Sequence, residues 1–377
     1  MKIVNHGKRK FIKLIVSVIS MSPFISSAGM YLTRNQENNS DGLINLKDFL
    51  TDDDWLDCNS KNPIRDHSYA LVKALSSGNK IYIPPVDGYY LFKDVEIPDG
   101  SILIGNAELP YTVKQKHDIT SLGSAISIYQ DGNSIFKINN HVTMSGLVFF
   151  GNKKIDGLPS ATGKKVSNVR LDKCGFYNFR TGIGSLTNYI KVDVKDCISS
   201  SNTVGIANIV DSKVVTSTIN ANVKHGIMLN SGANDNILSD LKIEWNGINN
   251  FYVSNAVNNI LSTSILDRSG KAGLYIENSE LVLQSLVIRR SGGTANLSSE
   301  STHFYINESN VMINGVLTKS GRNDDGSGNM SPDYTIYIEN ESATDSVIVS
   351  DSDLTGRLVN TFGGQSSNKI NTRNAKI

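Results

Sequence analysis

Two carboxylates at a fixed spacing are the residues of this chain best suited to chemistry. Glu244 and Asp267 lie 23 residues apart, and each directly follows an apolar residue in a short strand-like run. If the chain repeats with that period, the two side chains stack on neighbouring strands about 5 Å apart at the backbone. Mutual repulsion then raises the pKa of one carboxyl group, which leaves a protonated acid beside an anion. Because a glycosidase uses such a pair, we predict Glu244 as the acid/base and Asp267 as its partner.

Further polar residues in the same register extend the candidate site. The outward-facing row is predicted to read Asn220, Glu244, Asp267 and Arg289. Arg289 is suited to bind a sugar carboxylate or to lower the pKa of a neighbouring acid. Asp240 and Asn246 lie four residues before and two residues after Glu244, and we include both as candidates for substrate binding.

The next position along each run adds an aromatic residue and two more cations. It reads Ala221, Trp245, Arg268 and Arg290. Trp245 and Arg268 are candidates for substrate binding, with Trp245 stacking against a sugar ring. Alternatively, Trp245 packs at a corner of the coil, or Arg268 lies over its ring in a cation–π pair. The carboxylates have a structural alternative too, because charged ladders on such a face can be simple stacks of ion pairs.

These residues belong to a repeat of about 23 residues. The segment Asn236–Ser239 recurs 23 positions later as Asn259–Ser262, and the apolar residues of a third register, from Ile219 to Ile288, step by 24, 23 and 22. The runs are short, rich in Ile, Val, Leu and Thr, and separated by Gly, Asn and Ser, which is typical of strands. No proline lies between Pro159 and Pro332, as expected where proline would remove a ladder hydrogen bond.

The pattern predicts an all-β fold, a right-handed parallel β-helix with about 23 residues per rung. Rungs would stack about 4.8 Å apart. Asn236 and Asn259 would form an amide ladder inside the coil, and other asparagines would occupy left-handed corners. Cys174 and Cys197, also 23 residues apart, would stack in adjacent rungs as buried thiols or, alternatively, as a disulfide.

The periodicity divides the chain into four parts. These are an export signal (1–28), a lead-in with a capping helix and the opening strands (29–100), the β-helix (101–358) and a polar, frayed tail (359–377). We expect an amphipathic helix over Pro63–Ser77 that Gly78 ends and that covers the open end of the coil. Strands are predicted over Lys80–Pro85 and Tyr89–Ile97, and surface loops over 151–165 and 321–334.

The N-terminus carries the features of an export signal. Five basic residues and no acid precede a short apolar stretch, Leu14–Ile25, and Ser26–Ala28 offers a cleavage site. Gly7–Lys13 resembles a twin-arginine motif with Lys8 in place of its first arginine. We expect a periplasmic or extracellular protein without a stable membrane span in the mature chain, the alternative being an uncleaved anchor. The formal net charge of +1 argues against a nucleic-acid partner.

Two sets of motifs resemble known proteins. Residues 79–85 (NKIYIPP), Tyr89–Leu91 and 97–105 (IPDGSILIG) are similar to the opening of the pectate-lyase-like superfamily of β-helices. The segment Lys242–Asn246, followed by Asp267–Gly270, resembles phage tailspike depolymerases, which carry acid-Trp-Asn on one rung and Asp-Arg-x-Gly on the next. The export signal in place of a tailspike head further indicates a bacterial relative, like the β-helix proteins encoded with exopolysaccharide pathways.

The resemblance implies a polysaccharide partner and frames the alternatives for function. The first is an exported depolymerase that cleaves glycosidic bonds, with hydrolysis favoured over β-elimination. The second is a non-catalytic glycan-binding or assembly protein of a capsule or exopolysaccharide pathway, and a uronate epimerase is a minor third. We expect no cofactor and no metal, because no Cys/His cluster is present. A homotrimer, as in tailspikes, is an open possibility.

Overall fold

The computed structural model describes residues 42–321, 331–340, 346–356, 360–364 and 370–377. The chain divides into two compact units, and the described residues belong to the second, which runs from Asp41 to Ile377. The predicted export signal lies outside the described residues. No helix among the described residues is long and apolar enough to cross a membrane.

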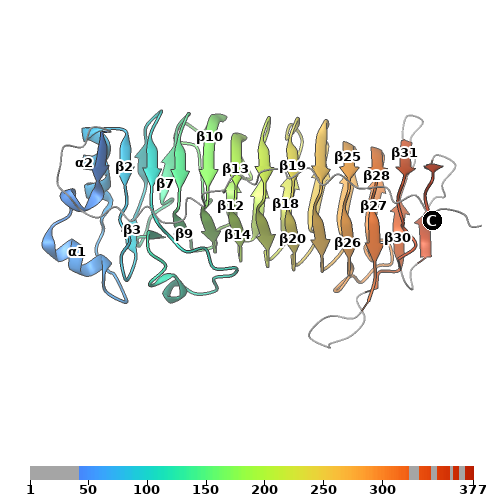
Figure 1. Ribbon diagram of the computed structural model, residues 1–377, viewed down its shortest axis with the longest axis horizontal. Helices are drawn as coiled ribbons and strands as arrows, with labels where there is room; N and C mark the ends of the chain where they lie inside the picture. The colour runs from blue at the N-terminus through green and yellow to red at the C-terminus, as the bar shows by residue number, and fades with distance from the viewer. Residues whose placement is uncertain (1–41, 322–330, 341–345, 357–359, 365–369) are drawn as a thin grey trace, which may run out of the picture. The chain divides into compact units, whose positions relative to one another are not determined.

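Nearly all strands of this unit belong to three parallel sheets that run along one coil (Figure 1). The first sheet has thirteen strands: β1 (Leu43–Asn45), β2 (Lys80–Tyr82), β5 (Ile102–Ile104), β8 (Thr143–Ser145), β10 (Val166–Asp172), β13 (Ile190–Lys195), β16 (Lys213–Val215), β19 (Ile237–Ser239), β22 (Asn259–Ser262), β25 (Glu280–Gln284), β28 (Asn310–Asn314), β31 (Ser346–Ser350) and β33 (Ile370–Arg373). The second sheet has ten: β3 (Tyr90–Phe92), β6 (Ala125–Ile128), β9 (Val148–Phe150), β11 (Gly175–Tyr177), β14 (Ile198–Ser200), β17 (Thr218–Asn220), β20 (Lys242–Glu244), β23 (Ile265–Asp267), β26 (Val287–Arg289) and β29 (Leu317–Lys319).

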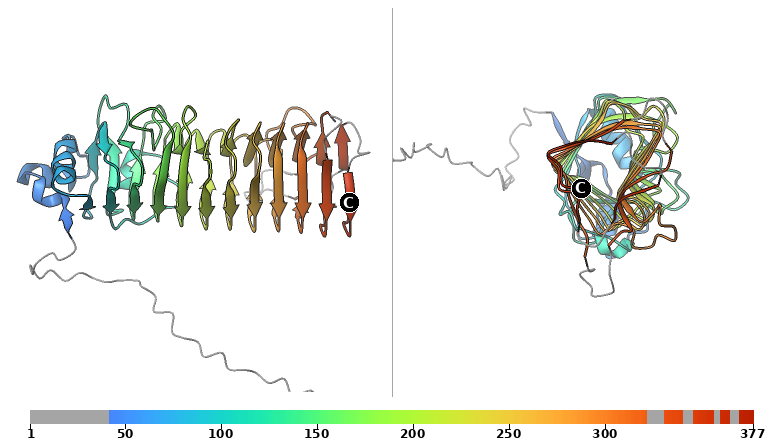
Figure 2. Two further views of the ribbon diagram at one scale, coloured as in Figure 1. Left: turned by 90° about the horizontal axis from the view of Figure 1, so that it is seen from above. Right: turned by 90° about the vertical axis from the view of Figure 1, so that its right-hand side faces the viewer.

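The third sheet has eight strands: β12 (Thr181–Gly184), β15 (Val204–Ala207), β18 (His225–Leu229), β21 (Phe251–Ser254), β24 (Leu274–Glu277), β27 (Thr302–Asn307), β30 (Tyr334–Ile338) and β32 (Asn360–Gly364). A separate pair, β4 (Val95–Ile97) and β7 (Phe136–Ile138), belongs to the early rungs. Seen along the axis, successive rungs superimpose around a shared interior (Figure 2). The predicted fold, a right-handed parallel β-helix with an N-terminal capping helix, is confirmed.

The predicted register of the second sheet is also confirmed. Ile219, Ile243, Leu266 and Ile288 pair in sequence and are buried in the core. Because side chains alternate along a strand, the following residues point out of the coil. That outer row is Asn220, Glu244, Asp267 and Arg289, paired as expected.

Corners between strands use residues in the left-handed region. Asp240, with φ 56°, turns the chain from the first sheet to the second. Trp245, Arg268 and Arg290 have φ between 51° and 58° and follow strands of the second sheet. Tryptophan and arginine seldom adopt this conformation, so the stacked rungs hold these three side chains at a defined edge.

Amide ladders tie neighbouring rungs together inside the coil, as predicted. The Asn236 side chain donates to Asn259 Oδ1 at 2.8 Å, and both residues are buried. A second ladder on the other edge joins Asn202, Asn222 and Asn246 through backbone and side-chain bonds. Cys174 and Cys197 occupy adjacent rungs as buried free thiols, and the Cys174 N–H lies 3.3 Å from Cys197 Sγ.

The capping segment is more ordered than the sequence suggested. Helix α2 spans Ser68–Ser77, so the predicted start at Pro63 was five residues too early, while Gly78 ends it as expected. The lead-in is not irregular: after β1, a 3-10 turn, η1, covers Leu46–Phe49, and helix α1 covers Asp52–Cys58. Thr51 and Asp54 form a capping box that starts α1. Acidic residues in the first turn further stabilise it through the helix dipole.

Other predicted boundaries shift for identifiable reasons. The strand expected over Tyr89–Ile97 is two strands, because Asp94 adopts φ 50° and turns the chain between β3 and β4. Residues 151–165 form no strand, although Ile155 and Leu158 are buried in the core. The tail is not wholly frayed, since β33 pairs with β31. The loop expected over 321–334 lies largely outside the described residues.

Candidate active site on the second sheet

Glu244 is a buried acid on the outside of the coil. It ends β20 and points outward because Ile243 points into the core, yet only 4% of the residue is exposed. Lys242 Nζ lies 3.2 Å from its Oε1. Burial raises the pKa of the Glu244 carboxyl, and the nearby charge of Asp267 raises it further, against the opposing effect of three arginines. Glu244 therefore retains its proton to higher pH than an exposed glutamate.

Asp267, the predicted partner of Glu244, is the centre of a buried ion cluster. It is 0% exposed and accepts hydrogen bonds from three guanidinium groups. Arg289 Nη2 lies 2.7 Å from Oδ2, Arg290 Nε lies 2.8 Å from Oδ1, and Arg268 Nη1 lies 3.3 Å from Oδ2. Both oxygens are thus occupied, so in this arrangement no part of Asp267 is open to a substrate.

The corner residues link this cluster to the surface. The Arg268 guanidinium carbon lies 4.1 Å from the centre of the Trp245 ring, which is the cation–π pair considered as an alternative above. Trp245 remains 42% exposed. One face of its ring is therefore taken by Arg268, and the remaining surface is open to solvent beside Glu244.

Tyr111 completes the site and was missed by sequence reasoning. It lies in the loop between β5 and β6, which contains the short 3-10 helix η2 (Lys116–Ile119) and runs beside the second sheet (Figure 1). The phenol donates a hydrogen bond to Glu244 Oε1, and Lys242 Nζ lies 5.0 Å from the ring centre. Tyr111 is itself 43% exposed. The Tyr111 side chain therefore covers the buried Glu244 carboxyl group and is itself partly exposed to solvent.

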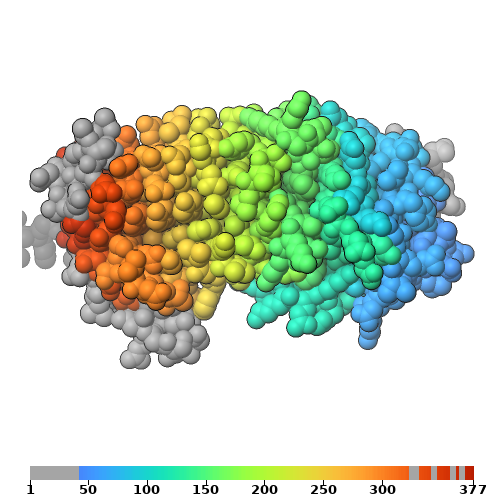
Figure 3. Space-filling model, turned by 180° about the vertical axis from the view of Figure 1, so that it is seen from behind, coloured from blue at the N-terminus to red at the C-terminus, as the bar shows by residue number. Residues whose placement is uncertain are grey.

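The loop is held against the coil by its own small core. Val113 and Ile119 are buried with Tyr177 and Phe150, apart from the main core inside the coil. The Tyr177 hydroxyl donates to the Pro110 carbonyl at 2.5 Å, next to Tyr111. In the space-filling view the loop stands out as a teal ridge at the lower edge of the coil (Figure 3). Since the loop does not repeat, periodicity gave no signal for it.

Two predicted substrate contacts lie elsewhere. Asn246 is 1% exposed and belongs to the internal ladder, where its Nδ2 donates to Asn250 Oδ1 at 2.8 Å. Its place is that of a structural residue, which corrects the expectation of a sugar contact. Asp240 is exposed at the opposite end of β20 from Trp245, and no bond joins it to Glu244. Arg289, by contrast, lies in the cluster as predicted and is partly exposed.

These contacts define what the site can do. Glu244 can hold and deliver a proton, Tyr111 and Trp245 offer aromatic surface beside it, and the surrounding cations favour a ligand with negative charge. Asp267 binds the three arginines, and its buried carboxylate is not exposed to a ligand. Among the described residues, no three His, Cys, Asp or Glu side chains gather to hold a metal ion.

Several solved structures share the fold of this chain. No family model matches the chain. It is similar to the A-module of the mannuronan C-5 epimerase AlgE6 of Azotobacter vinelandii, with a TM-score of 0.57 and 13% identity over 88% of this chain and 98% of that one. DFA-IIIase from Arthrobacter chlorophenolicus A6, without its lid and in complex with GF2, gives 0.59 and 12% over 89% and 94%.

The enzymatically active domain of tailspike protein 2 of bacteriophage CBA120 gives a TM-score of 0.56 and 14% identity. That match covers 76% of this chain and 45% of the tailspike chain. These likenesses establish a shared parallel β-helix fold.

Proposed function

We propose that this protein is an exported carbohydrate-active enzyme that cleaves glycosidic bonds of a polysaccharide by hydrolysis. Glu244 is its proton donor, and the polymer lies across the second sheet between Trp245 and Tyr111. The observation that carries the proposal is the environment of Glu244, a desolvated carboxyl with a raised pKa at the outer end of a strand. A general acid needs its proton at the working pH, and burial provides that.

Tyr111 has a defined role in this proposal. Its phenol hydrogen bond and its ring cover Glu244, so the leaving-group oxygen of a sugar must take the place of the phenol. Substrate binding therefore displaces Tyr111 from the carboxyl group, and the ring becomes available to contact the sugar. Burial of the carboxyl group raises its pKa, against the phenol hydrogen bond, which favours the charged form.

The role of Asp267 is revised from that expected above. As the anionic centre of the arginine cluster it positions Arg268 and Arg289, and its charge contributes to the raised pKa of Glu244. Water is then the nucleophile, and a carboxylate of the substrate, bound by the cations, accepts the proton that this water loses. Four cationic side chains around two acids favour an acidic polysaccharide, because a negative ligand balances their charge.

The named relatives support the substrate class. The epimerase is named for mannuronan, and the other two chains are described as an active tailspike domain and a DFA-IIIase with bound GF2. Export to the periplasm or the cell exterior, where such polymers occur, is part of the proposal. Sedimentation equilibrium tests whether the protein is a monomer or a homotrimer.

A second candidate is a glycan-binding protein without turnover. The saturation of Asp267 by three guanidinium groups favours it, since a glycosidase ordinarily uses two available carboxyl groups. In that case Glu244, Trp245 and the arginines hold the polymer without cleaving it.

A cleavage screen separates these possibilities. The protein starting at Gly29 is incubated with acidic and neutral surface polysaccharides, while reducing ends and the ultraviolet absorbance of an unsaturated uronate are followed together. Hydrolysis gives reducing ends without the absorbance, and elimination on a uronate gives both. Co-elution of intact polysaccharide without either signal, across the whole panel, contradicts the enzyme and supports the binding protein.

A further inference from the structure

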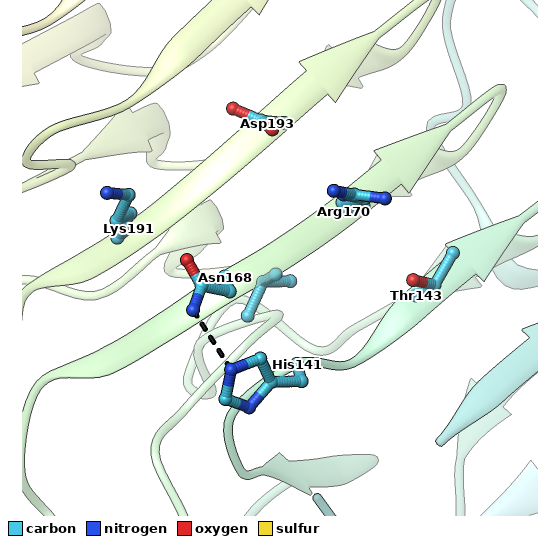
Figure 4. Close-up of a pocket in the computed structure, with 7 residues that line it drawn as sticks. His141, Thr143, Asn168, Arg170, Lys191 and Asp193 are labelled. Carbon is cyan, nitrogen blue, oxygen red and sulfur yellow. Dashed lines mark hydrogen bonds between the residues drawn. The ribbon is translucent and has the colours of Figure 1, made fainter. Parts of the chain in front are cut away.

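A polar hollow lies on the outer face of the first sheet, away from Glu244. It spans β8, β10 and β13 and has a volume of about 380 Å³. Figure 4 shows the side chains at its rim. The lining residues are His141, Thr143, Asn168, Arg170, Lys191 and Asp193, with Val169 between them.

An irregularity in β10 creates the hollow. The register between β10 and β13 shifts between Val166 and Val169, so β10 carries one extra residue there. Asn168, within this bulge, has φ 60°, and His141 on the neighbouring rung has φ 59°. Their side chains meet at 3.0 Å between Asn168 Nδ2 and His141 Nε2, which fixes this end of the hollow (Figure 4). Bulges re-aim side chains and are common beside binding sites.

The charged groups around the hollow leave it with a net positive charge. Arg170 and Asp193 are direct partners in the register of β10 and β13, and Lys191 precedes Asp193 by two residues on the same face. Among the described residues none of these three side chains forms an ion pair. Two cations and one carboxylate thus face a common space with a net positive charge.

We propose that this hollow binds a carboxylated sugar unit of a polysaccharide. Arg170 and Lys191 bind the carboxylate, the former through its planar fork and the latter as a point charge. Asp193 accepts hydrogen bonds from sugar hydroxyls, while Asn168 and Thr143 supply further polar contacts. Asp193 makes the hollow selective for such a sugar over phosphate. Its carboxylate repels a more highly charged anion but accepts hydrogen bonds from sugar hydroxyl groups.

The inference takes the polysaccharide from the proposed function but not the catalytic role of Glu244. The hollow and Glu244 lie on different sheets, so the two sites hold different units of one chain. A polymer that engages both sites is retained through effective concentration, whereas a short fragment gains nothing from the second site.

The test measures binding by titration calorimetry in protein with Glu244→Gln, in which turnover does not consume the probe. The acidic probes are tetragalacturonate and a hyaluronan tetrasaccharide; the comparison probes are maltotetraose and inorganic phosphate. For at least one acidic probe, Arg170→Met and Lys191→Met should each weaken binding about tenfold or more, as expected for a charge-assisted contact. Lys195→Met, the same change in the same strand outside the hollow, should change binding less than about twofold.

Several results would overturn the hollow as a sugar site. These are equal affinity of the Arg170→Met and parent proteins for both acidic probes, no binding of either, or binding of maltotetraose or phosphate as tight as that of the acidic probes. The proposed function fails separately. Arg170-dependent binding without any cleavage by the unsubstituted protein contradicts the enzyme alone, whereas cleavage without Arg170-dependent binding contradicts the hollow alone.

Discussion

At the scale of single residues, Glu244 and Asp267 occupy equivalent positions on neighbouring strands but meet different surroundings. Glu244 faces one lysine and one phenol, while Asp267 faces three guanidinium groups. The spacing predicted their adjacency but not this difference, because the arginines reach Asp267 from two rungs and from corner positions. Equal backbone positions therefore do not imply equal chemistry.

The first residue prediction concerns stability against pH. The folded-state pKa of Glu244 lies above its ordinary value of 4.5, so the folded protein binds this proton more tightly than the unfolded chain. Its stabilising contribution is present below about pH 4.5 and is lost as pH rises through the folded pKa, at about 1.4 kcal/mol for each pH unit between the two values. Glu244→Gln should therefore gain stability relative to the parent as pH rises above about 4.5.

Urea unfolding at several pH values measures this difference. The control is Glu96→Gln, the same change at an exposed acid of β4. A stability difference between the Glu244→Gln and parent proteins that stays flat with pH would contradict the buried, proton-retaining Glu244.

The second residue prediction concerns Asp267. Asp267→Asn leaves three buried or half-buried guanidinium groups without their anion, so it should destabilise the protein by about 3–5 kcal/mol. A solvated stack of ion pairs, the structural alternative considered above, would give only a small effect. Thermal or urea unfolding distinguishes the two, with Asp193→Asn as the exposed match, expected within about 0.5 kcal/mol. Equal small effects would mean that the cluster is a solvated ladder.

At the scale of elements, the rung is the unit that the sequence specifies best. Strands β19 and β22 carry the recurring Asn-Ile-Leu-Ser segment, and its two asparagines meet in the predicted ladder. Corners were harder to place, because Asp94 and Trp245 adopt left-handed conformations without glycine. Helix α1 was missed because its start signal, Thr51 followed by Asp54, lies within a run of acidic residues.

The ladder gives the first prediction at this scale. Asn259→Ala leaves the Asn236 side chain and N–H without their acceptor, so it should cost about 1–3 kcal/mol of unfolding free energy. Asn133, an exposed residue, provides the matched control, and its change to alanine should cost little. Comparable losses in urea unfolding for the two variants would argue against a buried ladder that contributes to stability.

The second prediction at this scale concerns the loop between β5 and β6. Tyr111→Phe removes a hydrogen bond that favours the charged form of Glu244, so the pKa of that carboxyl should rise further. The alkaline limb of the kcat/KM profile should move to higher pH by up to about one unit, the equivalent of one hydrogen bond. Tyr129→Phe, in which no hydroxyl bond is lost, should leave the profile in place. If the alkaline limb of the Tyr111→Phe profile stays at the same pH as that of the parent, Tyr111 does not influence the pKa of Glu244.

At the scale of the whole molecule, the fold was predictable and the site only in part. In a coil of repeated rungs, residues that pair on neighbouring strands recur at the spacing of the repeat. Periodicity alone therefore aligned Asn220, Glu244, Asp267 and Arg289. Contacts between residues at non-equivalent positions produce no periodic pattern in the sequence. Tyr111 reaches Glu244 across 133 positions of the chain, and the loop that carries it repeats nowhere.

The same scaffold accounts for the positions of the two proposed binding surfaces. Each sheet displays a row of side chains at the spacing of the rungs, and a bulge or a loop converts part of a row into a hollow or a covered acid. The second sheet carries Glu244 beneath the Tyr111 loop, and the first carries the hollow at Arg170. A long polymer would have to cross from one sheet to the next to contact both.

The central claim, that Glu244 delivers a proton to a glycosidic oxygen, is tested most directly by turnover of the Glu244→Gln protein. Release of reducing ends from the polysaccharide cleaved by the parent is measured under identical conditions, with unfolding curves to verify the fold. We expect kcat to fall about 10²–10⁴-fold while the protein stays folded and still binds the polymer. A folded Glu244→Gln protein that cleaves at the parent rate would contradict it.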